Sequence, residues 1–436
     1  MRPYLRLLQN NPDFTRVWLA QAVSLLGDWF NAIVLAAIVS RYAAELTGDN
    51  SRSGLAISAI LLARFLPPLL VSPLAGVLLD RFDRKRLLIA SDILRVVIVL
   101  GFLLASTPDR LWLIYVLTIA QFTVGAIFEP GRSALLPSIT RPQDLVTANL
   151  LGSMTWSVML AIGGMLGGLV AGVLGTAGAL IIDAATFAIS ALLLLPIRPR
   201  PLESKPDHPH AEAPKASARD FVDGLRYVRA HPSIGATLLV KLGGNFGSID
   251  AVMIIFATAI FVLGEDGVLS LGILWGSFGI GAVLGPLVLN RFNDGSVHIM
   301  RRLIIIGFAA ITIGWFVLSG SPTLLIAAVG IIIKAVGSSI YWTYSSVILQ
   351  KTADERFLGR MFSLDYAGFQ LAVVISTLIT GLALEALGND QVRTVVFVTG
   401  FASLLPLIAW VLIVIMIERA EQRAQKQQLA LHEIHD

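Results

Sequence analysis

The sequence contains no cysteine and carries little charge for its length. Without thiols the chain has no disulfide, no thiolate nucleophile and no cysteine-based metal or iron–sulfur site. Charged residues make up 14% of the 436 residues, whereas a soluble domain carries about 25%. Apolar residues reach 56%, and the mean hydropathy is +0.77. We therefore expect lipid to be the main solvent of this chain.

Further absences narrow the functional classes. The sequence has no G-x-x-x-x-G-K-[ST] loop and no nucleophile–base motif, so we expect neither ATP hydrolysis nor another enzymatic activity. None of the six histidines lies in an apolar run, and we expect no metal site and no bound cofactor. The net charge of +4 comes from positive residues in short loops, which indicates membrane topology rather than a nucleic-acid partner.

Long apolar runs recur along the whole chain. A transmembrane helix needs about 20 predominantly apolar residues. By this criterion we predict an all-α integral membrane protein with twelve transmembrane helices in two pseudo-symmetric six-helix bundles. The predicted spans are 17–40, 54–79, 87–106, 111–136, 148–173, 176–196, 234–262, 268–290, 302–319, 322–349, 361–386 and 392–417.

Basic residues concentrate on alternate connections between these runs. The expected outer connections hold only Arg41, Arg52, Arg110 and Arg393. The expected inner ones hold the cluster at 81–86 and many other basic residues, among them Arg2, Arg6, Arg16, Arg141, Arg291, Lys351, Arg360 and Arg419. Because positive loops stay inside, we expect a multi-pass protein of the inner (plasma) membrane with both termini cytoplasmic. Residues 1–16 have no apolar core, so no cleavable signal is expected.

A polar linker divides the chain. We predict a first bundle at 1–197, a cytoplasmic linker at 198–232, a second bundle at 233–418 and a cytoplasmic tail at 419–436. Phe221, Leu225 and Val228 recur in the linker at helical spacing. That pattern indicates a short amphipathic helix at the inner membrane surface, and a plain solvated linker is the alternative.

The most specific motif is GVLLDRFDRKRLL, at residues 76–88. It resembles the loop between helices 2 and 3 of the major facilitator superfamily, G-x-L-x-D-R-x-G-R-K/R, with Asp83 in place of the inner glycine. The stretch GPLVLNRF at 285–292 echoes it in the second half. The resemblance implies an inner gate in which Asp80 meets the start of the eleventh span. The residues assigned to this gate are Gly76, Asp80, Arg81, Arg84, Lys85 and Arg360.

Longer stretches resemble one group within that superfamily. NPDFTRVWLAQAVSLLGDWF at 11–30, FEPGRSALLPSITRPQDLVTANLL at 128–151 and IDAATFAISALLLL at 182–195 are similar to drug/proton antiporters of the macrolide-efflux and siderophore-export type. The resemblance implies alternating access driven by a proton gradient, and a monomer. The glycines of the fifth span resemble the antiporter signature G-P-x-x-G-G, which implies helix bending, and ordinary small-residue packing is the alternative. They are Gly163, Gly164, Gly167 and Gly168.

Charged residues inside the predicted spans are functional candidates, because burying a charge in lipid is costly. We expect Asp28, near the middle of the first span, to carry the coupling proton. A permanent structural pair between Asp28 and Arg64 is the main alternative. Asp250 and Lys334 either pair similarly or contact a charged substrate. Other charges in or near the spans include Asp92, Arg95, Asp183, Lys241 and Asp365.

Aromatic and polar residues on several spans suit an apolar cavity with few polar groups, although tryptophan and tyrosine also anchor helices at membrane interfaces. The cavity candidates are Asn31, Trp156, Asn245, Trp275, Tyr341 and Trp342. We predict a secondary active transporter, surrounded by membrane lipid, that exports a small amphipathic compound of drug, macrolide or siderophore type. A lipid or lysolipid flippase is the first alternative, and a non-transporting membrane sensor is the second.

Overall fold

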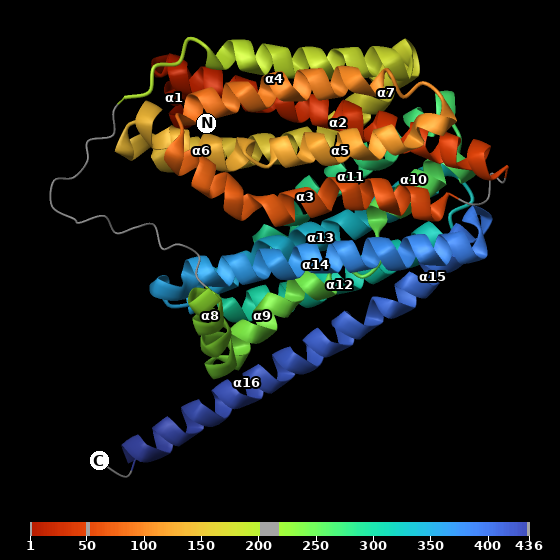
Figure 1. The fold of residues 1–436 in the computed structure, drawn as a ribbon. Helices are drawn as coiled ribbons and strands as arrows, with labels where there is room; N and C mark the ends of the chain where they lie inside the picture. Colours follow the sequence, from red (N-terminus) through yellow and green to blue (C-terminus); the bar gives the residue numbers. More distant parts are fainter. Residues whose placement is uncertain (1, 49–52, 201–217, 434–436) are drawn as a thin grey trace. The chain divides into compact units, whose positions relative to one another are not determined.

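The computed structural model describes residues 2–48, 53–200 and 218–433, and every long element in them is a helix (Figure 1). The described part contains no strand. The first helices are α1 (Arg2–Asn10), α2 (Pro12–Thr47), α3 (Gly54–Arg81), α4 (Arg84–Phe102), α5 (Leu111–Gly125), α6 (Phe128–Ile139), α7 (Leu145–Leu194) and α8 (Ala218–Ala230). The others are α9 (Pro232–Gly243), α10 (Ile249–Ile255), α11 (Val268–Leu289), α12 (Val297–Ser319), α13 (Leu324–Thr352), α14 (Glu355–Leu387), α15 (Val392–Ala402) and α16 (Leu404–Glu433).

All twelve predicted spans coincide with helical segments. Within the described residues, nine helical segments are long and apolar enough to cross a membrane. The remaining predicted spans are α4, the first part of α7, and α9 together with α10. The helix α4 carries five charged residues, and Gly247, with φ +79°, lies in the break between α9 and α10. The all-helical prediction is confirmed, and the number twelve stays a prediction.

Helix boundaries follow local chemistry. The side chain of Asn11 accepts a hydrogen bond from the Phe14 N–H at the start of α2, and Asp83 accepts one from the Arg86 N–H at the start of α4. These side chains satisfy backbone donors that have no partner within the helix. Inside α7, Gly175 has φ +71° and breaks the helix between the fifth and sixth predicted spans. Such a conformation favours glycine, which has no side chain to clash.

The chain packs as two compact units whose segments alternate along the sequence. The first comprises residues 1–215, 248–279 and 374–395, and the second comprises 216–247, 280–373 and 396–436. In the first unit α2 and α4 pack along α7, and α5 lies against α3 and α4. In the second, α12 packs against α13 and α16. The predicted division at 197 and 233 follows chain order rather than these packing units, and it stays a prediction.

The linker forms a helix, α8, whose exposed and packed sides are distinct. The Tyr227 ring stacks on Phe357 with centroids 4.3 Å apart, and its hydroxyl oxygen accepts a hydrogen bond of 3.0 Å from the Asp354 N–H. Val228 and Tyr227 also pack on a small core formed by Ile234, Leu349 and Met361. The predicted helix is therefore confirmed, and this part of its apolar face contacts protein within the second unit.

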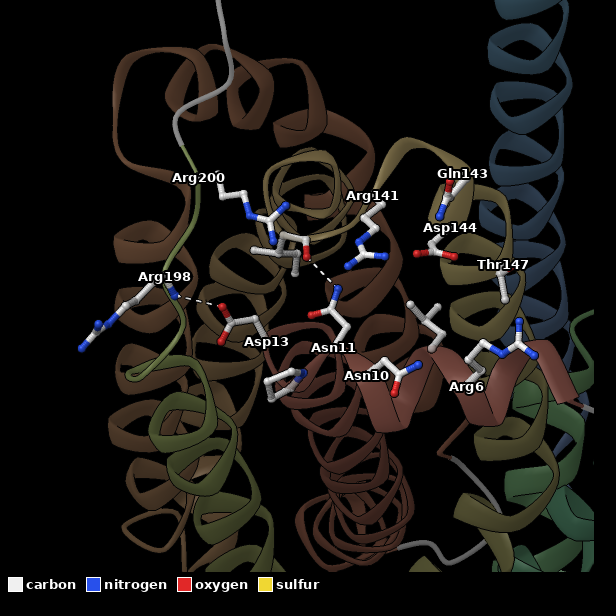
Figure 2. Close-up of a pocket in the computed structure, with 13 residues that line it drawn as sticks. Arg6, Asn10, Asn11, Asp13, Arg141, Gln143, Asp144, Thr147, Arg198 and Arg200 are labelled. Carbon is white, nitrogen blue, oxygen red and sulfur yellow. Dashed lines mark hydrogen bonds between the residues drawn. The ribbon is translucent and has the colours of Figure 1, made fainter.

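A pocket of about 570 Å³ lies where α1, α2 and α7 approach one another in the first unit (Figure 2). It opens beside the junction of α1 and α2 and is bordered by residues 139–147 and by Arg198 and Arg200. A buried apolar cluster that includes Leu7, Phe14 and Ile139 supports its walls. This pocket is separate from the buried charges described next.

Candidate functional site

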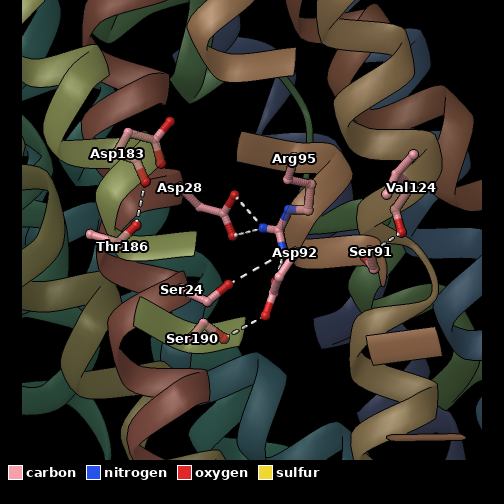
Figure 3. Close-up of polar contacts among 9 residues, drawn as sticks. All are labelled: Ser24, Asp28, Ser91, Asp92, Arg95, Val124, Asp183, Thr186 and Ser190. Carbon is pink, nitrogen blue, oxygen red and sulfur yellow. Dashed lines mark hydrogen bonds and ion pairs between the residues drawn. The ribbon is translucent and has the colours of Figure 1, made fainter. Parts of the chain in front are cut away.

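The strongest concentration of buried charge in the first unit surrounds Arg95 on α4 (Figure 3). The guanidinium Nη2 donates to both carboxylate oxygens of Asp28 at 2.9 Å. Its Nη1 lies 3.4 Å from Asp92 Oδ1 and donates to Ser24 Oγ at 3.3 Å. The hydroxyl of Ser190 donates to the other Asp92 oxygen at 2.6 Å. One arginine thus holds two carboxylates.

Helical spacing places the network residues of each helix on one face. Ser24 and Asp28 are four residues apart on α2, and Asp92 and Arg95 are three apart on α4, so each pair lies on one helix face. The Phe187 ring of α7 covers the guanidinium, with its centroid 3.8 Å from the central carbon. Arg95 is 4% exposed, whereas the Asp28 side chain is 24% exposed. Only the Asp28 carboxylate therefore keeps substantial access to solvent.

The alternative of an ion pair between Asp28 and Arg64 is not found in the structure. Asp28 is engaged by Arg95, and Arg64 on α3 instead lies over the rings of Phe122, at 5.2 Å, and Trp29, at 5.9 Å. Both arginines occupy apolar spans, so hydropathy cannot distinguish them. The rotation of α3 and α4 about their axes decides which one faces Asp28.

Asp183 on α7 lies beside the same network and is completely buried. Neither of its carboxylate oxygens has a hydrogen-bond partner in the part of the chain that the structure describes. A Cβ atom added at Gly27 would lie 2.5 Å from Asp183 Oδ1 and 2.0 Å from Thr186 Oγ1. Glycine at position 27 is therefore what lets α2 and α7 approach so closely.

A small cavity of about 30 Å³ lies near Arg64. Arg64 and Asp250 bring opposite charges to its lining, and Asn31, Trp275 and Phe122 line it as well. A cavity of this size holds about one water molecule. Two of the predicted cavity residues, Asn31 and Trp275, are therefore brought together, at a site too small for a drug-sized compound in this conformation.

The other predicted cavity residues have different surroundings. In the second unit, the Asn245 amide donates to the Tyr341 hydroxyl at 3.2 Å, and Trp342 packs its ring 4.2 Å from the Lys241 ammonium. Trp156 is 52% exposed, which agrees with the alternative of an aromatic anchor facing lipid. Asn245, Tyr341 and Trp342 belong to the second unit, and Trp156 belongs to the first.

The second unit has its own buried ion pair. Lys241 on α9 contacts the carboxylate of Asp365 on α14 and donates to Ser346 Oγ at 3.0 Å. The two side chains are 5% and 1% exposed. Lys334 on α13 instead lies 5.2 Å from the Trp315 ring and 3.5 Å from Ser338 Oγ. Lys334 and Asp250 belong to different units, so their expected pairing stays a prediction.

The four glycines of the fifth predicted span lie in regular helix, and the break in α7 is at Gly175. Cβ atoms at Gly163 and Gly164 would lie 2.4 Å from side-chain atoms of Trp29 and Trp275, respectively. A Cβ at Gly167 would lie 3.1 Å from the Trp29 carbonyl oxygen, and one at Gly168 2.6 Å from that of Val268. These glycines provide close packing of α7 against α2 and α11. The bend expected at them is absent from this structure.

Segments distant in sequence are joined at the end of the first unit that holds Arg41. Its Nη1 lies 2.7 Å from Asp266 Oδ2, and the Asn389 amide donates to Ser53 Oγ at 2.8 Å. Further hydrogen bonds at this end connect Ser40 with Thr258 and Ser58 with the carbonyl of Thr377. Residues before position 60 are thereby tied to residues after position 250.

The motif at 76–88 is described only in part. The surroundings of Gly76 and the side chain of Asp80 lie outside what the structure describes, so the predicted gate contact of Asp80 stays a prediction. Arg84 donates to the Ala134 carbonyl at 2.8 Å, and Lys85 to the Leu195 carbonyl at 2.6 Å. Both basic residues tie the loop to its own unit. Arg81 is exposed, and Arg360 lies 5.2 Å from the Phe357 ring within the second unit.

Asp83, which departs from the family pattern, has a local explanation. Its carboxylate accepts the 2.8 Å hydrogen bond from the Arg86 N–H and so caps α4. Glycine is tolerated at an N-cap, but aspartate is among the preferred residues. The substitution therefore retains a helix start at this position.

Sequence reasoning noted Asp92 and Arg95 but assigned them no role, and it missed Ser24 and Ser190. The available signal was an acid and a base three residues apart inside an apolar run, because such a pair places two opposite charges on one helix face. The two serines gave no signal, since small hydroxyl residues are common in membrane helices.

Comparison with known proteins gives one family. Residues 17–332 match the model of the Major Facilitator Superfamily. The uncharacterized MFS-type transporter YfiS of Bacillus subtilis is 25% identical over 233 residues, about half (53%) of each chain. The putative bacilysin exporter BacE of Bacillus subtilis is 20% identical over 86% of this chain and 89% of its own. Macrolide efflux protein A of Streptococcus pyogenes is 23% identical over 87% and 91%, respectively.

A solved structure gives the same fold. The crystal structure of a bacterial homologue of the human lysosomal transporter Spinster, inward-facing and unoccupied, has a TM-score of 0.70 and 15% identity to this chain. The match covers 92% of this chain and 97% of that one. At this identity the likeness concerns the fold alone.

Proposed function

The chain belongs to the major facilitator superfamily and is a multi-pass membrane transporter with a small-molecule substrate, and on that premise we propose that it couples proton entry to export of a small amphipathic compound. Export is supported by the relatives named as efflux proteins for macrolides and, putatively, bacilysin. The proposed location is the plasma membrane, with both termini cytoplasmic, as the distribution of basic residues favours. We propose a monomer that needs no cofactor beyond the proton gradient.

The observation that carries proton coupling is the arrangement of two carboxylates around Arg95. Asp28 is the partly exposed member, bound at 2.9 Å through both oxygens, and Asp92 is completely buried at 3.4 Å. A proton that binds Asp28 removes its negative charge and weakens the ionic hydrogen bonds to Arg95. The guanidinium keeps Asp92 as its counter-ion, so this change leaves no uncompensated charge in the protein. Loss of the bond between α2 and α4 would then favour another helix arrangement.

The joined end of the first unit supports alternating access. In the proposed orientation, Arg41 and the segments it binds lie on the outer side, and the ion pair with Asp266 closes that side. Opening would separate Arg41 from Asp266 and Asn389 from Ser53. The small cavity between Arg64 and Asp250 would widen at the same time into a site with opposite charges and aromatic walls. Such a lining suits an amphipathic compound.

Purified protein in liposomes with an imposed pH gradient tests this proposal. The panel contains a macrolide, a hydrophobic cation, a siderophore and a fluorescent lysolipid, and the internal pH is recorded with a trapped dye. We expect one of the first three compounds to move against its gradient while protons move the opposite way. Transport of the lysolipid alone would favour the flippase alternative, and the absence of any linked proton movement would contradict coupling.

Asp28→Asn isolates the coupling step. The amide cannot exchange a proton, so transport driven by the pH gradient should be abolished, while downhill exchange of the same compound continues. Asp109→Asn is the matched control, because it removes one exposed acid in the short helix at 108–110, outside the network. Full gradient-driven transport by Asp28→Asn would place the proton site elsewhere, and Asp250 would be the next residue to replace.

A further inference from the structure

The pocket beside α1 is lined by four arginines and two acids. Arg141 and Arg200 direct their guanidinium groups toward the space above Asn11, whereas the guanidinium of Arg6, on α1, lies on the other side of the pocket and points toward the side of Thr147 (Figure 2). The guanidinium of Arg198 points away from that space (Figure 2). The pocket of about 570 Å³ therefore has two guanidinium groups on one side and a third, from Arg6, on the other.

The two acids of the pocket form no ion pair with these guanidinium groups, which can therefore bind a ligand. Asp13 lies 3.0 Å from Arg16 and also accepts from the backbone N–H of Arg198 at 3.5 Å. Asp144 is the other acid at the rim. In the described part of the chain, no ion pair joins a carboxylate to Arg6, Arg141 or Arg200. Positive charge thus exceeds negative charge inside the pocket.

Hydrogen bonds between distant segments build its walls. The Asn11 amide donates to the Ile139 carbonyl at 2.7 Å, and the Arg200 N–H donates to the Ser138 carbonyl at 2.9 Å. These bonds fix the segment that carries Arg200 against the end of α6. The arginine backbones are therefore positioned before any ligand binds, which lowers the entropy cost of binding.

The helices add to the positive potential. Both α2, which begins at Pro12, and α7, which begins at Leu145, start at this pocket. A helix N-terminus carries a partial positive charge and favours anions. Guanidinium groups bind phosphate oxygens through paired hydrogen bonds. Two guanidinium groups that face one space, a third at the far side and two helix starts suit a ligand with several anionic oxygens better than a single carboxylate.

We propose that this pocket binds a phosphate group, supplied either by the headgroup of an anionic phospholipid or by a soluble diphosphate. In the proposed orientation it lies on the cytoplasmic side, where basic pockets meet anionic headgroups. Binding would tie α1 to the segment around Arg200 within the first unit. This site is separate from the transport network around Arg95.

Native mass spectrometry of the full-length protein tests the proposal in two arms. In one, the protein is reconstituted in phosphatidylcholine nanodiscs and supplied with phosphatidylglycerol. In the other, inorganic pyrophosphate is titrated into the protein in neutral detergent. Retention of phosphatidylglycerol over phosphatidylcholine would identify the headgroup as the ligand, and saturable pyrophosphate binding alone would identify a soluble one. Absence of both would overturn the proposal.

Variants separate the pocket from general surface charge. Arg141→Gln and Arg200→Gln should each weaken binding about tenfold, because each removes a charged hydrogen-bond donor. Arg198→Gln is the matched control, since it removes the same charge from a side chain that points away, and its affinity should be unchanged. Equal losses in all three would show nonspecific attraction and overturn the site. Arg141→Lys is the control for loss of binding through misfolding. It keeps the charge and should bind with intermediate affinity.

Discussion

Two buried ion pairs, one in each unit, differ in how far they are closed to solvent. Asp28 and Arg95 form a two-oxygen contact in which the carboxylate is 24% exposed, and the arginine has a second carboxylate, Asp92, within 3.4 Å. Lys241 and Asp365 are 5% and 1% exposed, and no second acid of the described residues pairs with the lysine. In the proposed mechanism the first pair exchanges a proton and keeps a counter-ion. In the second pair, loss of the charge on either partner would leave the other charge buried without a counter-ion.

The contrast teaches that a charge inside a membrane helix is not by itself a functional signal. What distinguishes the two pairs is solvent access and the presence of an alternative partner. A closed pair holds helices together, because its separation costs several kcal/mol of desolvation. We therefore assign coupling to the pair in the first unit and stability to the pair in the second. Four variants test this assignment.

The largest effect is expected for Lys241→Met. The substitution leaves the Asp365 carboxylate buried without its cation, so the free energy of unfolding should fall by about 3–5 kcal/mol. Thermal unfolding in detergent, followed by tryptophan fluorescence, measures the loss. A change below about 1 kcal/mol would mean that water or another cation replaces the lysine, and the assignment of this pair to stability would be withdrawn.

Replacing both partners should reverse most of that loss. Lys241→Met combined with Asp365→Leu removes both charges and fills the space with apolar groups, which is often neutral or stabilising. We expect the free energy of unfolding to lie within about 1–2 kcal/mol of that of the original protein. Gradient-driven transport should survive. If the stable double variant lost proton coupling, the second pair would also belong to the transport machinery.

Arg95→Lys tests the geometry of the first pair. Lysine keeps the charge but loses the planar fork that binds both Asp28 oxygens. We expect stability to fall by about 1–2 kcal/mol and gradient-driven transport to slow about tenfold. Arg110→Lys is the companion variant, because Arg110 is exposed and lies outside both the network and the small cavity. Equal slowing by both variants would argue against a special role for Arg95.

The smallest change in stability is expected for Asp28→Asn. The side chain is partly exposed and Arg95 retains Asp92, so the free energy of unfolding should change by only about 1 kcal/mol. The same variant should lose coupling completely in liposomes. A loss of stability as large as that of Lys241→Met would mean that the first pair is also mainly structural.

Much of the fold could be predicted from the sequence because its causes are local. Apolar runs of membrane length predicted the helices, and a polar stretch with helical spacing predicted α8. The predicted span ends at 173 and 176 also enclose the break in α7, where Gly175 adopts a backbone that other residues avoid. Each of these signals lies within a few residues of the feature it produces.

The site was predicted only in part. Asp28 was identified as an acid within a membrane span, and a pair with Arg64 was the main alternative to its proton role because both lie near the middle of their spans. The structure pairs Asp28 with Arg95 and leaves Arg64 over the Phe122 ring. A helix turns about 100° per residue, so a small rotation decides which of two arginines faces a given carboxylate. Sequence spacing along one helix contains no information about that rotation relative to another.

What the sequence alone determined is the membrane as solvent, the helical class, the loop motif and the set of charges that had to be accommodated. Hydropathy and charge sum along the chain and need no partner. Only the tertiary structure decided which charges meet, because that depends on how closely helices approach. Gly27 against Asp183 and Gly168 against Val268 set those distances in the first unit. Side chains far apart in sequence become partners only after such contacts fix the orientation of each helix.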